Sequence, residues 1–145
     1  MLIVSSPAFA AGKVVPAPIT GKYFSDLTSQ SLYKNLESTN PYVLQTISQY
    51  IQGVLAGAYA MSYIDNSMSN FGNDKKALEL DKAVAYCFNT YVAPYSDTQR
   101  RLIVLDWLRS HPTLWNNQLA ADDILDAFGA LSPPKMMKDD CSLVF

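Results

Sequence analysis

The stretch that decides the fold is Pro41-Tyr-Val-Leu-Gln-Thr-Ile-Ser-Gln-Tyr-Ile-Gln-Gly-Val-Leu-Ala-Gly-Ala-Tyr-Ala-Met61. Its apolar residues recur at helical spacing, at Leu44, Ile47, Ile51, Val54, Leu55, Ala58 and Met61. Asn40 is a favourable N-cap, and Pro41 sits at the first helical position, where its missing N–H costs nothing. We therefore expect a central helix that begins at Pro41.

Two glycines, Gly53 and Gly57, lie four residues apart in this helix. Each weakens a helix by roughly 1 kcal/mol relative to alanine, so a compensating contact is expected. The close approach of another helix would supply it, either from the same chain or from a second copy in a homodimer. Small residues at this spacing also occur in membrane dimers, but polar residues between 45 and 52 break the apolar run well short of the roughly 20 residues a span needs. The pattern favours a buried helix and no membrane span.

The composition predicts one domain with a substantial core. The chain has 145 residues, of which 49% are hydrophobic and 17% charged. Its net charge is −2, and its longest basic run is Arg100-Arg101. These values exclude the electrostatic footprint of a protein that binds nucleic acid or anionic lipid.

The first residues are typical of an exported protein. An apolar segment leads to Ala8-Phe9-Ala10, which fits an Ala-x-Ala cleavage site with Ala11 as the mature N-terminus. The alternative is an ordinary buried N-terminal strand, which Pro7 disfavours. We expect residues 1–10 to be a signal peptide remnant, residues 11–21 an extended leader, and residues 22–145 a single helical domain with a C-terminal tail. The pattern predicts an exported protein.

The chain has two cysteines, Cys87 and Cys141. An exported chain tends to pair its thiols, so we expect one disulfide. It would close a loop of about 53 residues, for which the chain-entropy model gives roughly 4 kcal/mol. The alternative is two buried free thiols. Neither cysteine has metal-ligand spacing, so no metal or other cofactor is predicted.

Four further helices are expected. The first opens near Phe24 with Ser25 as its cap, and the next spans Lys75 to Asn89 with Asp74 as its cap. Ser96-x-x-Gln99 is a capping box that opens Asp97 to Ser110, which His111-Pro112 ends. The last runs from Asn117 or Gln118 to Leu131 and stops at Pro133-Pro134. The inward residues are expected to be Leu27, Leu32, Tyr33 and Leu36; Leu78, Leu80, Ala83, Val84, Cys87 and Phe88; Leu102, Ile103, Leu105, Trp107 and Leu108; and Leu119, Ala120, Ile124, Leu125, Ala127, Phe128 and Leu131.

Residues 65–74, which separate the central helix from the next, are polar and rich in turn-formers, and they predict a loop. Asp122 and Asp123 lie near the start of the last helix, where they suit its dipole. No strand-like alternation and no internal repeat is present. The predicted fold class is all-α, a compact bundle of about five helices.

No motif points to catalysis. A cysteine nucleophile needs a base within hydrogen-bond reach, and the single histidine is His111. A pairing of Cys87 with His111 is formally possible, but the disulfide competes with it. Adjacent carboxylates such as Asp122 and Asp123 are usually caps or solvated charges, and no phosphate-binding glycine loop or nucleophile elbow is present. We predict that the protein is not an enzyme.

A binding role is suggested by aromatic residues outside the helices. Phe71 lies in the predicted loop, Trp115 follows His111-Pro112, and Tyr95 sits beside Pro94. Loop aromatics often pack on their own domain, but they also serve as interface anchors. Three of them together favour a protein partner over a small ligand.

The chain resembles the Rap/Tai-type periplasmic immunity proteins that neutralise cell-wall amidase effectors of type VI secretion. The resemblance runs from about residue 24 to residue 131. It rests on Phe24-x-x-Leu27 with Leu32-Tyr33 and Leu36-Glu-Ser38, on Tyr50-Ile51-Gln-Gly53-Val54, and on Trp107-Leu-Arg-Ser-His-Pro112 followed by Ala120-Ala121 and Ile124-Leu125-x-Ala127-Phe128. The chain departs from the family in lacking a proline soon after Cys87 and in placing Cys141 seven residues after Pro134.

The resemblance implies an inhibitor, commonly a dimer, that covers the active-site cleft of an exported peptidoglycan amidase or hydrolase without chemistry of its own. We expect residues 65–74 and the Trp115 connector to form the contact surface. Asn66 and Asn70 would donate amide hydrogen bonds around Phe71, and Trp115 would be a second anchor. The alternative is a periplasmic stress chaperone or structural helical protein without a toxin partner, which would bind broadly and weakly.

Overall fold

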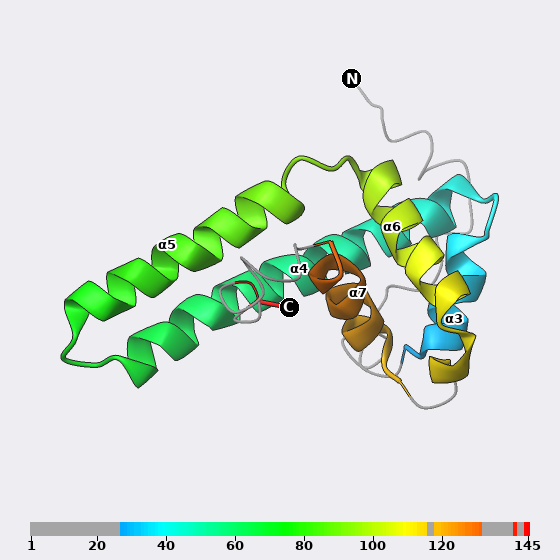
Figure 1. Ribbon diagram of the computed structural model, residues 1–145. Helices are drawn as coiled ribbons and strands as arrows, with labels where there is room; N and C mark the ends of the chain where they lie inside the picture. The colour runs from blue at the N-terminus through cyan, green and yellow to red at the C-terminus, as the bar shows by residue number, and fades with distance from the viewer. Residues whose placement is uncertain (1–26, 116–117, 132–140, 142–143) are drawn as a thin grey trace, which may run out of the picture.

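The computed structural model describes residues 27–115, 118–131, 141 and 144–145, and within these residues the chain is all-α (Figure 1). The helices are α3 (Ser29–Leu36), α4 (Pro41–Ser69), α5 (Asp74–Tyr91), α6 (Asp97–Ser110) and α7 (Ala120–Gly129), and a short 3-10 helix, η1 (Pro112–Leu114), follows α6. The predicted all-α bundle is therefore confirmed. The expected signal peptide remnant, the leader and Pro133-Pro134 lie outside the described residues.

Local sequence signals set most of the helix starts. The Asn40 side chain accepts a hydrogen bond from the Tyr42 N–H (3.0 Å), and both hydrogen bonds of the Ser96–Gln99 capping box form. Two predicted caps were wrong by one to three positions. The hydroxyl of Thr28 caps α3, and Asn73 rather than Asp74 caps α5.

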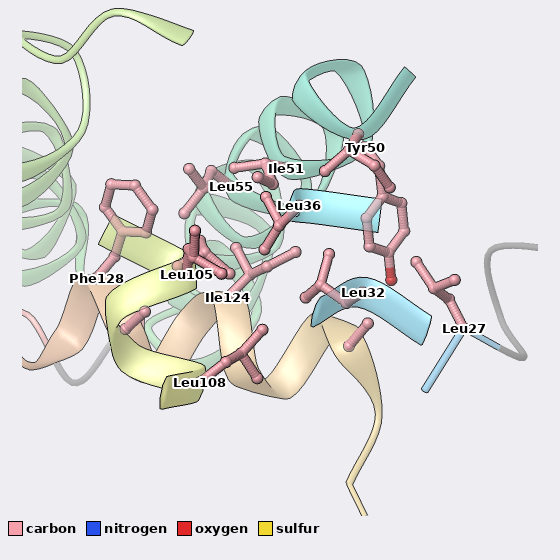
Figure 2. Close-up of a cluster of buried hydrophobic side chains, with 14 of the residues drawn as sticks. Leu27, Leu32, Leu36, Tyr50, Ile51, Leu55, Leu105, Leu108, Ile124 and Phe128 are labelled. Atoms are coloured by element: carbon pink, nitrogen blue, oxygen red, sulfur yellow. The ribbon is translucent and has the colours of Figure 1, made fainter. Parts of the chain in front are cut away.

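The body of the molecule is built around the first half of α4, against which α3, α6 and α7 pack. Figure 2 shows their side chains converging on one core, which includes Leu32, Leu36, Ile51, Leu55, Leu105, Leu108, Ile124 and Phe128. Burying each of these side chains contributes about 1.5–3 kcal/mol. An isolated bridge between Thr28 and Leu119 joins the segments that lead into α3 and α7.

The second half of α4 leaves this body and pairs with α5 as a helical hairpin, which projects to the left in Figure 1. We refer to residues 53–91 of this hairpin as the arm. Its α4 half is eight residues longer than the predicted stretch, which ended at Met61, so the prediction of a loop over residues 65–74 was wrong. The inward positions of the added turns are the polar residues Ser62 and Asn66. A prediction that relies on apolar periodicity therefore ends the helix too early.

The disulfide fixes the chain end to the arm. Cys87 in α5 and Cys141 are bonded (S–S 2.06 Å), which confirms the predicted pair. Both are buried with Val84 and Val144 in a small second core, against which Tyr59 and other aromatic residues pack. Such a bond is typical of an oxidising compartment. Across the part of the chain that the structure describes, no helix combines the length and apolar character that a membrane span requires.

Candidate partner-binding surface at the tip of the arm

The tip of the arm is a tight turn that displays one aromatic ring. Residues 70–73 connect α4 to α5, and the Asn73 N–H closes the turn by donating to the Asn70 carbonyl oxygen (2.8 Å). Gly72 adopts φ +84°, a left-handed conformation that glycine reaches without strain. Phe71 precedes it with 95% of its surface exposed. The chain therefore holds a large apolar side chain in solvent on a short, hydrogen-bonded turn.

Two more apolar side chains lie within about one helical turn of this tip. Met68, in the last turn of α4, is 74% exposed, and Leu78, in the second turn of α5, is also exposed. We define Met68, Phe71 and Leu78 as the tip patch. Leu78 was predicted to face inward, and that prediction was wrong. Apolar residues gathered at the end of a projection are characteristic of a protein-binding site.

The two asparagines predicted at this surface have different environments. Asn70 caps α4, and its side-chain amide donates to the Asn66 carbonyl oxygen (3.0 Å). Asn66 lies in α4, is buried, and has a side-chain nitrogen with no hydrogen-bond partner among the described residues. The structure therefore corrects the prediction that Asn66 is a loop residue available to a partner, whereas Asn70 does lie next to Phe71.

A second exposed surface follows the outer side of α4. Gly53, Gly57, Met61, Ile64 and Met68 recur at helical spacing, and we define them as the outer stripe. Ile64 is nine residues from the buried Leu55, which places the two on opposite sides of the helix.

The glycines of this stripe have open space beside them. A Cβ atom built on Gly53 or on Gly57 would meet no atom of another described element within 4 Å. Among the described residues, no helix therefore crosses α4 at these glycines, contrary to the intramolecular alternative. Contact with a second molecule remains as the prediction for them, because the outer stripe is the apolar face that the arm leaves uncovered.

The interior of the arm combines aromatic and polar contacts. The Tyr59 and Tyr63 hydroxyls are hydrogen-bonded to each other (2.9 Å), and the Tyr59 ring lies 4.5 Å from that of Phe88. The hydrogen bond with Tyr59 and, to a lesser degree, burial raise the pKa of Tyr63 to about 12. The Tyr63 phenol is therefore neutral at physiological pH. Both residues bridge α4 and α5, Tyr63 by donating to the Asp81 carbonyl oxygen (3.4 Å) and Tyr59 by its ring contact with Phe88.

Trp115 is not part of the tip surface. Its ring packs at a tilt against Tyr33 with centroids 4.4 Å apart, and its indole N–H donates to the Leu108 carbonyl oxygen (2.9 Å). It therefore packs on its own domain, against the main core. Tyr95, the third candidate anchor, is half-buried against the main core. Of the three aromatic residues, Phe71 has the environment of an interface anchor.

The possible cysteine–histidine pair does not form, because Cys87 is bonded to Cys141. His111 lies stacked on Trp107 (3.7 Å), and its Nδ1 is hydrogen-bonded to the Trp107 carbonyl oxygen (2.8 Å). The described residues contain no cluster of three or more side chains arranged to hold a metal ion.

Asp123 is a buried carboxylate, whereas its place at a helix start had predicted a cap or a solvated charge. Asp123, in the first turns of α7, is fully buried, and neither of its oxygens has a partner among the described residues. Burial raises the pKa of this carboxyl. The nearby Ser29 hydroxyl would lower the pKa of Asp123, but this hydroxyl donates its hydrogen bond to the Gln118 carbonyl oxygen (3.1 Å).

Two leucines that were predicted to face inward, Leu102 and Leu119, are exposed instead.

Comparison of the chain with protein-family models, with curated proteins and with solved structures gives no match. The proposals below therefore rest on the geometry of the arm and of the body, and on the sequence resemblance described first.

Proposed function

We propose that this protein is a periplasmic immunity protein that inhibits an exported peptidoglycan amidase or hydrolase by placing the tip patch in its active-site cleft. The observation that carries the proposal is the exposure of Phe71 at the end of a projecting arm. A catalytic cleft is concave, and a narrow convex tip is the shape that enters one. The protein contributes no catalytic group and acts by excluding substrate.

The arm is built to present the tip at low entropic cost. Its two helices are capped on both sides of the turn, by Asn70 and Asn73, and the disulfide clamps α5 nearer its far end. A turn that is already ordered loses little conformational freedom on binding, so more of the contact energy appears as affinity. The disulfide also fits the oxidising compartment in which such effectors act. The net charge of −2 would speed encounter with a basic effector more than it deepens affinity.

The proposal includes a homodimer formed through the outer stripe. Two copies of α4 that pack antiparallel would set the small Gly53–Gly57 end of one stripe against Met61 and Ile64 of the other, which leaves Met68 to the tip patch. A two-fold axis makes both halves of this contact identical, and the residues of the stripe are themselves uncharged. The two glycines, which weaken the isolated helix, would then permit close approach of the helices.

The test uses a purified exported peptidoglycan amidase. Inhibition is measured by the clearing of peptidoglycan sacculi, and binding is measured by calorimetry. We expect one effector bound per protomer and loss of sacculus clearing. Phe71→Ala should weaken binding by at least about 2 kcal/mol while its circular dichroism spectrum stays unchanged. Leu102→Ala, which removes an exposed leucine from α6 in the body, is the matched control and should bind as the wild type does.

Retention of full inhibition by folded Phe71→Ala would show that the tip patch is not the inhibitory surface. Failure of the wild type to bind any exported amidase from its own envelope extract would reject the immunity role itself.

The second candidate is a periplasmic chaperone, which the outer stripe favours. Methionine side chains are flexible and recur on surfaces that bind many partners, and Met61 and Met68 are both exposed. A chaperone would capture many unfolded envelope proteins weakly, and Ile64→Glu would reduce that capture more than Phe71→Ala would. A single stoichiometric hydrolase in the bound fraction would favour the immunity role.

A further inference from the structure

A polar groove lies on the body, away from the arm. It occupies about 510 Å³ between the first half of α4 and the first turns of α6. Its walls carry hydroxyl, amide and guanidinium groups, and Pro41 and Leu44 give it an apolar end. The volume falls in the range of small-ligand sites. The starts of α4 and α6, which line the groove, lie far from the turn between α4 and α5 (Figure 1), and the groove shares no lining residue with the tip patch or the outer stripe.

Arg101 is the charged group that defines the groove. Its guanidinium donates to the Ser48 hydroxyl and, at 3.3 Å, to the Thr98 hydroxyl. Ser48 is itself buried, so the guanidinium is held against a fixed wall. Both acceptors are neutral, and their hydrogen bonds leave the positive charge of the guanidinium uncompensated.

The other two arginines of α6 have carboxylate partners. Arg100 pairs with Asp97 (3.8 Å) and Arg109 with Glu37 (3.1 Å), whereas Arg101 has no ion pair among the described residues. Asp97 also lines the groove, and its carboxylate contacts Arg100 and makes no ion pair with Arg101 among the described residues. A positioned guanidinium without a carboxylate is suited to binding an anionic group from outside, because charge-assisted hydrogen bonds from arginine to carboxylate are strong and directional.

Three glutamines line the groove on both sides of the contact between Ser48 and Arg101. Gln45, Gln49 and Gln52 follow at intervals of four and three residues, which places them along one side of α4. Their side-chain amides have no hydrogen-bond partner among the described residues. Each amide offers both a donor and an acceptor, which is the pair of groups that a peptide unit needs. The row from Gln45 to Gln52 is about 10 Å long, the length of about three residues of extended chain.

We propose that this groove binds a short extended peptide with a free carboxyl terminus. The carboxylate binds the Arg101 guanidinium beside Ser48, and the chain runs from there toward Pro41 and Leu44, where a ligand side chain packs. The glutamine amides on either side of Ser48 hydrogen-bond the carboxylate and the adjoining peptide unit. The site is independent of the immunity role, because it uses no residue of the arm tip or of the outer stripe.

The experiment is a titration of the ¹⁵N-labelled full chain with tetra-alanine, with binding followed by backbone amide chemical shifts. We expect saturable shifts confined to the first half of α4 and the start of α6. The C-terminal amide of the same peptide should bind about tenfold more weakly, because it lacks the charge that pairs with Arg101. Arg101→Gln should lose affinity for the acid by a similar factor and no longer distinguish acid from amide.

Arg109→Gln is the matched control, since it makes the same charge change on the same helix outside the groove, and it should bind the peptide as the wild type does. The proposal is overturned if the shifts do not saturate or lie elsewhere. It is also overturned if acid and amide bind equally to the wild type, or if Arg101→Gln, with an otherwise unchanged spectrum, binds the acid normally. None of these outcomes affects inhibition by the arm, which is measured with Phe71→Ala.

Discussion

Removing the disulfide is the sharpest test of how the arm is held. Cys87 and Cys141 are 54 residues apart in the sequence, and closing a loop of that length in the unfolded chain corresponds to about 4 kcal/mol of stability. For a domain of this size, about 1 kcal/mol changes the melting temperature by roughly 3–5 °C. The Cys87→Ala/Cys141→Ala variant should therefore melt about 15 °C below the wild type. Alanine is preferred to serine because both sites are fully buried, and a serine hydroxyl there would have to find a partner.

The assay is thermal unfolding followed by circular dichroism, with and without reductant. Reduced wild type should melt near the double variant, and reductant should leave the variant unchanged. Hydrogen exchange should quicken around Val84 and Cys87, where Val144 would no longer be tethered to the second core. A loss below about 1 kcal/mol would refute the loop-entropy reasoning. It would mean that the packing of Val144 and Phe145 holds the chain end without the bond.

Three further predictions concern single residues. Because burial raises the pKa of Asp123, its charged form destabilises the fold, and the free energy of unfolding should rise as the pH falls from 7 toward the ordinary pKa of aspartate. Asp123→Asn removes the charge, so it should be more stable than the wild type at pH 7 and should lose this dependence in denaturant titrations across pH. An unchanged pH profile in that variant would assign the dependence to other groups. Gly57→Ala should raise the unfolding free energy of the monomer by up to about 1 kcal/mol, since its Cβ meets no neighbour, and urea unfolding at low protein concentration checks this. Ile64→Glu should lower the mass seen by sedimentation from dimer to monomer, and a dimer that survives it does not use the outer stripe.

Helix identity and most helix starts were predictable because their causes are local. The Asn40 cap with Pro41 and the Ser96–Gln99 capping box satisfy backbone donors within three residues of themselves, so no tertiary contact is needed to place those starts. The disulfide was predictable for another reason: two cysteines leave one intramolecular pairing. Phe71 was identified as a candidate anchor from its polar surroundings, and it is the most exposed of the large hydrophobic residues described.

The tertiary structure alone decided where α4 ends and which residues face inward. The turns around Ser62 and Asn66 persist because α5 lies beside them and Tyr63 reaches the Asp81 backbone, a contact 18 residues away that periodicity cannot register. Trp115 was assigned to a surface from its place in a connector, but Tyr33 and Leu108 provide it with a packing site on the body. Asp123 was predicted to be a solvated helix-start charge, and the arrival of α3 over α7 buries it. Helix caps thus follow from hydrogen bonds to nearby backbone donors, and the disulfide follows from the number of cysteines. Burial depends on which helix packs against a residue from elsewhere in the chain.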